Sequence, residues 1–197
     1  TNTFGSFTSV VFGSNIDLGA AATLTANSNN SFFDFANFVL TGNAFLQNVA
    51  ANIATANADG FSAAGALGSV QTTTRTFSAS GSFVYSGTSA QVTGSGAASA
   101  FTISAFNPAG VTLSQTTTIA GFSGGAYLNF NGYNGKLYLS NFDLILTASA
   151  TVVNIPFSNA YFIVTNGTGK LFQTVAATDV TYIIGNTSYN PITLRNT

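Results

Sequence analysis

The side chains of this chain that could take part in acid–base chemistry are few. The sequence contains no histidine, cysteine or glutamate, and its five carboxylates are Asp17, Asp34, Asp59, Asp143 and Asp179. A pair of carboxylates can hydrolyse a glycosidic bond, but none of these aspartates lies in a recognisable catalytic motif. Triads of serine or cysteine with histidine are impossible here, and zinc and haem sites need cysteine or histidine. The sequence therefore predicts a protein that is not an enzyme, with no catalytic residue, no metal site and no cofactor.

Three Asn-x-Ser/Thr triplets are candidate modification sites. They begin at Asn29, Asn166 and Asn186. All three lie in stretches typical of turns, where the acceptor of a glycan must be exposed. We expect at least one of them to carry a covalent N-glycan, which would also solubilise a surface with few charges.

The low charge of the chain narrows the classes of partner. Only 5% of its 197 residues are charged, against about 25% in typical soluble domains. Its four basic residues are scattered, so no patch is predicted that could neutralise nucleic-acid phosphates. No stretch of about 18 apolar residues is present, so we expect no membrane-spanning helix in the mature chain.

Composition also suggests where the protein works. Few native ion pairs can be lost on acidification, so we expect unusual acid tolerance. The chain has no cysteine and no methionine, which are the residues most readily oxidised. We interpret the chain as a mature product whose targeting segment has been removed, in an extracellular setting.

The elements that would position any site are predicted to be short β-strands. Apolar and polar residues alternate over 99–106, 111–120 and 137–146, with many Thr, Val and aromatic residues. The segment YFIVTNGTGKLFQTV (161–175) predicts a hairpin that turns at Asn166-Gly167. No repeat of fixed period is apparent. Ten or so short strands with Gly-rich turns predict an all-β protein with a single β-sandwich, of jelly-roll or immunoglobulin-like type.

One stretch has a different pattern. In NAFLQNVAANIATANADG (43–60), Phe45, Leu46, Val49, Ala50 and Ile53 recur at helical spacing. This spacing predicts one short helix near 43–57. Asn43 would cap its start, and Asp59-Gly60 would end it.

The first nineteen residues, TNTFGSFTSVVFGSNIDLG, form an apolar alternating segment that is too long for one ordinary strand. A bend at Gly13 and Ser14 would divide it into a tail (1–12) and the start of a β-sandwich head domain (13–197). An unpaired tail would expose an apolar strand that is prone to aggregate. The tail therefore either pairs within its own domain or is donated to the next copy. Donation favours a head-to-tail homopolymer. The donor strand would use Phe4, Ser6, Phe7, Thr8, Val10, Val11 and Phe12, with Gly13 and Ser14 as its hinge.

In these features the chain resembles donor-strand filament subunits. It is similar in character to the archaeal surface filaments called threads, and more loosely to archaeal bundling pilins and bacterial TasA-like fibre proteins. The segments that carry the resemblance are TFGSFTSVVF and GSNIDLG, together with the Thr/Ser/Asn/Gly-rich strands and the glycosylation triplets. The resemblance implies a sandwich that lacks one strand, which the tail of a neighbour fills. It also implies glycosylation and a role in cell adhesion or biofilm as a cell-surface filament (pilus).

Other functions stay open at this point. A monomeric carbohydrate-binding adhesin or a surface-layer module would share the Asn/Thr-rich β-surface but would show an aromatic platform. A capsid protein would form closed shells. An ice-binding β-solenoid is suggested by QTTTRT (71–76) and SQTTTI (114–119), but it would need Thr-x-Thr at a regular period, which the sequence does not show.

Overall fold

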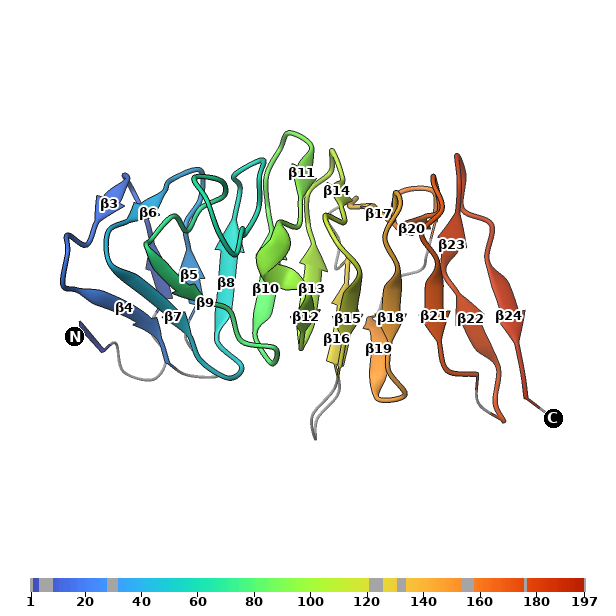
Figure 1. The fold of residues 1–197 in the computed structure, drawn as a ribbon. Helices are drawn as coiled ribbons and strands as arrows, with labels where there is room; N and C mark the ends of the chain where they lie inside the picture. The colour runs from blue at the N-terminus through green and yellow to red at the C-terminus, as the bar shows by residue number, and fades with distance from the viewer. Residues whose placement is uncertain are drawn as a thin grey trace.

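The fold is a parallel β-solenoid of about seven turns, shown in Figure 1. The structure, a computed structural model, describes residues 2–3, 9–27, 32–120, 126–130, 134–153, 158–175 and 177–196. Short parallel strands stack on three faces, and most turns contribute one strand to each face. The ends of the chain lie at opposite ends of the resulting rod.

The first face consists of two sheets that follow one another along the rod. Their strands are β1 (Asn2–Thr3), β4 (Thr23–Ala26), β7 (Ala44–Gln47) and β9 (Thr74–Thr76), then β12 (Ser99–Ala100), β15 (Thr117–Ile119), β18 (Leu144–Leu146) and β21 (Leu171–Gln173).

The second face is one continuous seven-stranded parallel sheet. Its strands are β2 (Ser9–Val11), β5 (Phe32–Asp34), β8 (Asn52–Thr55), β10 (Ser82–Tyr85), β13 (Thr102–Ala105), β16 (Ala126–Asn129) and β19 (Ala150–Val153).

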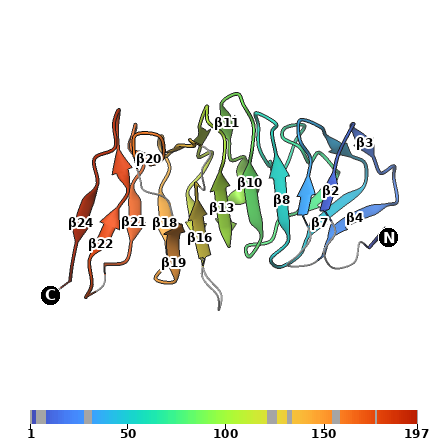
Figure 2. The same cartoon turned by 180° about the vertical axis from the view of Figure 1, so that it is seen from behind.

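The third face has the shortest strands. They are β3 (Ile16–Asp17) and β6 (Leu40–Thr41), then β11 (Gln91–Val92), β14 (Val111–Thr112), β17 (Leu137–Tyr138), β20 (Ile163–Val164) and β23 (Ile184–Gly185). A 3-10 helix, η1 (Ser95–Ala97), follows β11, and the C-terminal end is an antiparallel pair of β22 (Val180–Tyr182) and β24 (Ile192–Leu194). Figure 2 shows the second face from behind, with β2 near one end and β19 near the other.

Apolar side chains stacked in register fill the interior. On the second face the inward row consists of Val10, Phe33, Ile53, Phe83, Ile103, Leu128 and Val152. Strands in such a stack alternate inward apolar and outward side chains, which is why the sequence alternates. The turns have unequal length: 20 residues separate Phe33 from its partner Ile53, but 30 separate Ile53 from Phe83. Unequal turns conceal the repeat from a search for a fixed period.

The longest turn holds an aromatic side chain at the centre of the core. Phe61, in the connection between β8 and β9, is fully buried. Its ring centroid lies 5.8 Å from that of Phe83 and 6.1 Å from those of Phe35 and Tyr85. The connection therefore packs into the solenoid and contributes to the core.

Arg75 secures the same connection from the first face. Its guanidinium group donates hydrogen bonds to the carbonyl oxygens of Thr72 (3.1 Å), Ser62 (3.3 Å), Gly65 (2.7 Å) and Val70. Desolvation lowers the pKa of Arg75. The bonds to four carbonyl groups let this charged group lie partly buried.

The solenoid corrects the prediction of a single β-sandwich. A sandwich would pair strands antiparallel, whereas every pair in the described residues except β22–β24 and two isolated bridges is parallel. The hairpin predicted at 161–175 is wrong for the same reason. β20 pairs with β17 and β23, and β21 pairs with β18, so Asn166-Gly167 turns a corner between two faces.

The predicted helix near 43–57 is also wrong. The segment forms β7 and β8 on adjacent faces, joined by a corner at which Ala50 has a φ of 58°. Phe45 and Ile53 both point into the core. Phe45 and Ile53 are eight residues apart on either side of the corner, and Val49 between them is 65% exposed in the corner. The apolar corner residue completes the i, i+4 and i+8 spacing of a helix, which explains the misassignment.

Candidate functional site

The five aspartates are dispersed, and two of them cap local turns. Asp17 accepts a hydrogen bond from the amide of Gly19 (2.9 Å), and Asp34 accepts one from the amide of Ala36 (2.8 Å). The Oδ1 atom of Asp143 accepts one from the amide of Lys170. Within the described ranges, no cluster of three or more potential metal-ligating side chains is found. The lack of enzyme activity, metal and cofactor stays a prediction.

The feature that stands out in the backbone is an interruption of the second face near the C-terminal end. The first and third faces continue past the seventh turn, because β21 pairs with β18 and β23 pairs with β20. The second face stops at β19, and β22, the next strand after β21 in sequence, pairs with β24 in a separate sheet. We call this interruption between β19 and β22 the seam.

The seam leaves two strand edges without a backbone partner in the part of the chain that the structure describes. No ladder joins β19 to β22 among those residues. In Figures 1 and 2, β22 and β24 lie beyond β21 toward the C-terminal end, apart from β19. Unpaired strand edges are templates for another strand.

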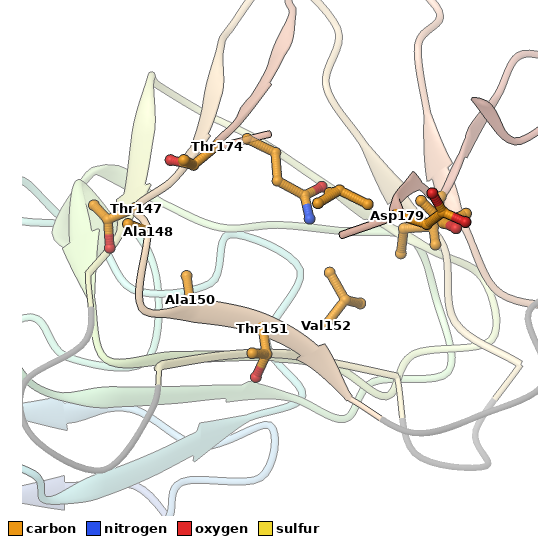
Figure 3. Close-up of a pocket in the computed structure, with 11 residues that line it drawn as sticks. Thr147, Ala148, Ala150, Thr151, Val152, Thr174 and Asp179 are labelled. Atoms are coloured by element: carbon orange, nitrogen blue, oxygen red, sulfur yellow. The ribbon is translucent and has the colours of Figure 1, made fainter. Parts of the chain in front are cut away.

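A cavity of about 340 Å³ lies in the seam. Its lining residues are Thr147, Ala148, Ala150, Thr151, Val152, Gln173, Thr174, Asp179, Val180, Thr181 and Ile183. Figure 3 shows Ala150 and Val152 of β19 pointing into the cavity and Thr151 pointing the other way, with Thr174 and Asp179 across from them. The cavity thus has an apolar side that continues the core and a polar rim.

Gln173 places an unsatisfied acceptor in the wall of this cavity. It occupies the inward position of β21, in register with Leu146, Ile119 and Ala100 of the preceding turns. Its side-chain Oε1 atom is buried and accepts no hydrogen bond from the residues that the structure describes. A buried acceptor without a donor destabilises a fold by about 1–3 kcal/mol. A ligand that brought an N–H or O–H group into the cavity would remove this penalty.

The far wall of the seam is held by two side-chain interactions. The Tyr182 hydroxyl donates to the carbonyl oxygen of Gln173 (2.5 Å), and the Nε atom of Arg195 lies 2.7 Å from the Oδ1 atom of Asp179. The ion pair is exposed, so it contributes little energy. The β22–β24 ladder is the other contact that holds β22. An unpaired strand edge of the kind found at β19 and β22 can accept an extended peptide by strand addition.

The structure places the predicted donor residues as follows. Phe4, Ser6, Phe7 and Thr8 lie outside the described residues. Val10 and Val11 belong to β2, which pairs with β5 of the same chain, and Phe12 is buried against Phe35 with a centroid distance of 4.7 Å. Val11 points outward and is 65% exposed. Self-pairing, the alternative that the sequence left open, is thus the state of β2 in the isolated chain, and donation stays a proposal.

The remaining predicted residues that the structure describes lie at the surface. The chain bends at Gly13 and Ser14 between β2 and β3. Asn166 is exposed, and its Oδ1 atom accepts a hydrogen bond from the amide of Ser140 (3.0 Å). Asn186 is exposed in a bend after β23, and Asn29 lies outside the described residues. Glycosylation and the hinge role both remain predictions.

The ice-binding alternative is the one hypothesis from the sequence that assumed a β-solenoid, so its threonine pattern can be compared with the observed strands. Thr74 and Thr76 of β9 point outward, but their partners in β7 are Ala44 and Leu46. Thr118 of β15 has Ile145 of β18 as its neighbour, and Phe172 follows. The rows therefore mix threonine with apolar side chains, and the regular threonine array that ice binding needs is interrupted.

Comparisons with known proteins identify no relative. No protein-family model, no curated protein and no solved structure matches the chain. Among the residues that the structure describes, no helix has the length and apolar character to cross a bilayer. The class of the protein therefore rests on its fold, the parallel β-solenoid.

Sequence reasoning did not find the seam. The only local sign is Gln173, a polar residue at the position in KLFQTV where alternation calls for an apolar one. This sign becomes meaningful only once the stacking register with Leu146 is known.

Proposed function

We propose that this chain is a structural subunit of an extracellular filament that polymerises head-to-tail, with the seam as the acceptor for a strand of the next copy. The observation that carries the proposal is the pair of unpaired edges, β19 and β22, that face a cavity with a buried, unsatisfied acceptor. The filament would support adhesion or biofilm at the cell surface.

The donor in this proposal is the segment 1–12. Its described strands each form one ladder in the isolated chain, β1 with β4 and the edge strand β2 with β5. In the seam β2 would lie between β19 and β22 and form two ladders. Each added backbone hydrogen bond contributes about 0.5–1.5 kcal/mol.

The side chains of the donor match the two sides of the seam. Val10 and Phe12 point inward in their own first turn, and in the seam they would fill the apolar side of the cavity beside Val152 and Ile183. Val11 would remain outward, on the side of Thr151. The exchange breaks the β1–β4 and β2–β5 ladders. It also breaks the stack of Phe12 on Phe35, and the loss of this buried ring alone opposes the exchange by about 2 kcal/mol. We therefore expect slow, concentration-dependent assembly.

The geometry of the rod makes the polymer open-ended. The donor lies at one end of the solenoid and the seam near the other. Such a heterologous contact does not close on itself unless the rotation happens to form a ring. Each added copy leaves a free seam at one end of the polymer and a free donor segment at the other, so the fibre can continue to grow.

A disulfide trap tests the proposal in the full chain. Because the chain has no cysteine, a mixture of Val11→Cys and Thr151→Cys proteins can form only the disulfides that the two new thiols allow. We expect a heterodimer of the two variants under mild oxidation, identified by peptide mass, because both side chains point outward on neighbouring strands in the assembly.

The matched control is Thr102→Cys, an outward position at the centre of the same face and in the same register row. It should not cross-link to Val11→Cys. Equal cross-linking at residues 102 and 151, or none at 151 while filaments are visible by electron microscopy, would refute the seam as the acceptor. Absence of filaments at every concentration would refute the filament itself and favour a monomeric surface module.

A further inference from the structure

A second cavity lies far from the seam, on the outer surface of the second face. It has a volume of about 280 Å³ and is lined by Phe32, Asp34, Ala54, Val84, Ser86 and Phe106. We call it the outer cleft. It crosses β5, β8 and β10, toward the N-terminal half of the rod in Figure 2.

The cleft is a consequence of the register. Asp34, Ala54 and Val84 are successive partners in one outward row. Ala54 contributes only a methyl group between two larger neighbours, so the surface is hollow above it. Phe32 lies two residues before Asp34, and Ser86 and Phe106 follow the ends of β10 and β13. The result is a hollow with an alanine floor and aromatic walls.

The polar groups of the cleft are mostly acceptors. Asp34 is the only charged residue in the lining, and one of its oxygens accepts the Ala36 amide. The Ser86 hydroxyl donates to the carbonyl oxygen of Thr55 (3.4 Å). The described lining of the cleft therefore holds a carboxylate and two phenylalanine rings, and no cationic side chain.

The basic side chains of the chain are engaged elsewhere or lie outside the lining. Arg75 binds the carbonyl groups of its loop, Arg195 pairs with Asp179, and the Nζ atom of Lys136 lies 4.8 Å from the Phe162 ring centroid. Lys170 is not among the residues that line the cleft. The negative charge of Asp34 thus has no counter-ion within the described residues.

We propose that the outer cleft binds an organic ammonium ion, either a primary or a methylated amine. Aromatic faces attract cations through their quadrupole, and a carboxylate in a partly apolar hollow adds charge attraction. A neutral sugar needs donors as well as acceptors, and an anion would be repelled by Asp34. The ammonium ion is the ligand class that satisfies the rings and the carboxylate together. The inference is independent of the filament.

The test uses the full chain and choline chloride as the probe, with 3,3-dimethyl-1-butanol as a neutral molecule of the same shape. Binding is followed by calorimetry and by the ring resonances of phenylalanine in NMR. We expect millimolar binding of choline that is at least about tenfold tighter than that of the neutral molecule. Added salt should weaken choline binding and leave the neutral molecule unaffected.

Three variants locate the site. Asp34→Asn keeps the acceptor for the Ala36 amide but removes the charge, and should weaken choline binding about tenfold. Ala54→Leu should fill the cleft and abolish binding. Asp143→Asn, at a carboxylate outside the cleft, is the control and should bind choline as the parent does. The proposal is wrong if the neutral molecule binds equally well, if Asp34→Asn binds choline unchanged, or if methyl glucoside binds more tightly than choline.

Discussion

Replacement of Gln173 by leucine should stabilise the isolated chain. Gln173 lies in an inward row whose other members are Leu146, Ile119 and Ala100, and its Oε1 atom is buried without a partner. Leucine removes the unsatisfied acceptor and keeps a side chain of similar size in the cavity wall. Since the hydrogen bond from Tyr182 goes to the backbone carbonyl of residue 173, the substitution leaves that bond intact.

The magnitude follows from the penalty for one buried unsatisfied acceptor. That penalty is about 1–3 kcal/mol. Taking the lower end of this range, we expect a gain of about 1 kcal/mol in the free energy of unfolding. In a chain of this length, 1 kcal/mol raises the thermal midpoint by about 2–4 °C.

The matched control is Gln91→Leu, because Gln91 is a buried glutamine whose amide is satisfied. Its Oε1 atom accepts hydrogen bonds from the Gly87 amide and the Asn107 side chain, both at 2.8 Å. Its Nε2 atom donates to the carbonyl oxygens of Thr55 and Asn57. Leucine would leave two buried donors unsatisfied, so we expect a loss of about 3 kcal/mol or more.

Thermal and urea unfolding, followed by circular dichroism, measure both changes. We expect opposite signs for the same Gln→Leu substitution at the two positions. If both variants lose stability by similar amounts, the Oε1 atom of Gln173 has a hydrogen-bond partner and the expected gain is wrong.

Other predictions concern the core, the pH dependence and the tail. Phe61→Ala should lower the free energy of unfolding by about 3–5 kcal/mol in urea titrations, since the ring is fully buried among aromatic neighbours; a loss below about 1 kcal/mol would contradict its place in the core. Burial raises the pKa of the Tyr85 phenol, so the folded state keeps its proton while the unfolded state ionises above a pH of about 10. Stability should therefore be full below that pH and decline above it, and Tyr85→Phe should flatten the alkaline decline of the thermal midpoint. On the acid side the thermal midpoint should change little down to a pH of about 3, because one exposed ion pair is found among the described residues; an unfolding midpoint near pH 4 at low salt would refute this. Deletion of residues 1–12 should give soluble, unpolymerised chains by electron microscopy and size-exclusion chromatography, and filaments that survive the deletion would exclude the tail as donor.

The alternation of apolar and polar residues was sufficient to predict an all-β protein of short strands. It could not distinguish a sandwich from a solenoid, because both bury every second side chain. The information that separates them is the partner of each strand. For Ile53 the partners are Phe33 and Phe83, at unequal sequence distances. Pairing of this kind is non-local, and unequal turns remove the repeat that would have revealed it.

Local turn signals were ambiguous for a related reason. Asn166-Gly167 has the residues of a tight hairpin, but here it turns a corner between β20 and β21, and the Asn166 side chain caps the amide of Ser140 from the preceding turn. The corners of a solenoid and the tight turns of hairpins favour the same residue types. The candidate site was harder to predict than the fold. The seam is the absence of a strand ladder, and no sequence motif marks such an absence. Only the inward position of Gln173 hints at it.

Amide hydrogen exchange of the full chain, compared between dilute monomer and assembled material, tests the central claim most directly. Exchange in a strand edge slows when the edge gains a backbone partner. We predict that assembly slows exchange by at least about tenfold in β19 (Ala150–Val153) and β22 (Val180–Tyr182), with the centre of the second face at β10 and β13 unchanged. If exchange in β19 and β22 is the same in both samples, or if protection appears only at β24, the seam is not where one copy receives another.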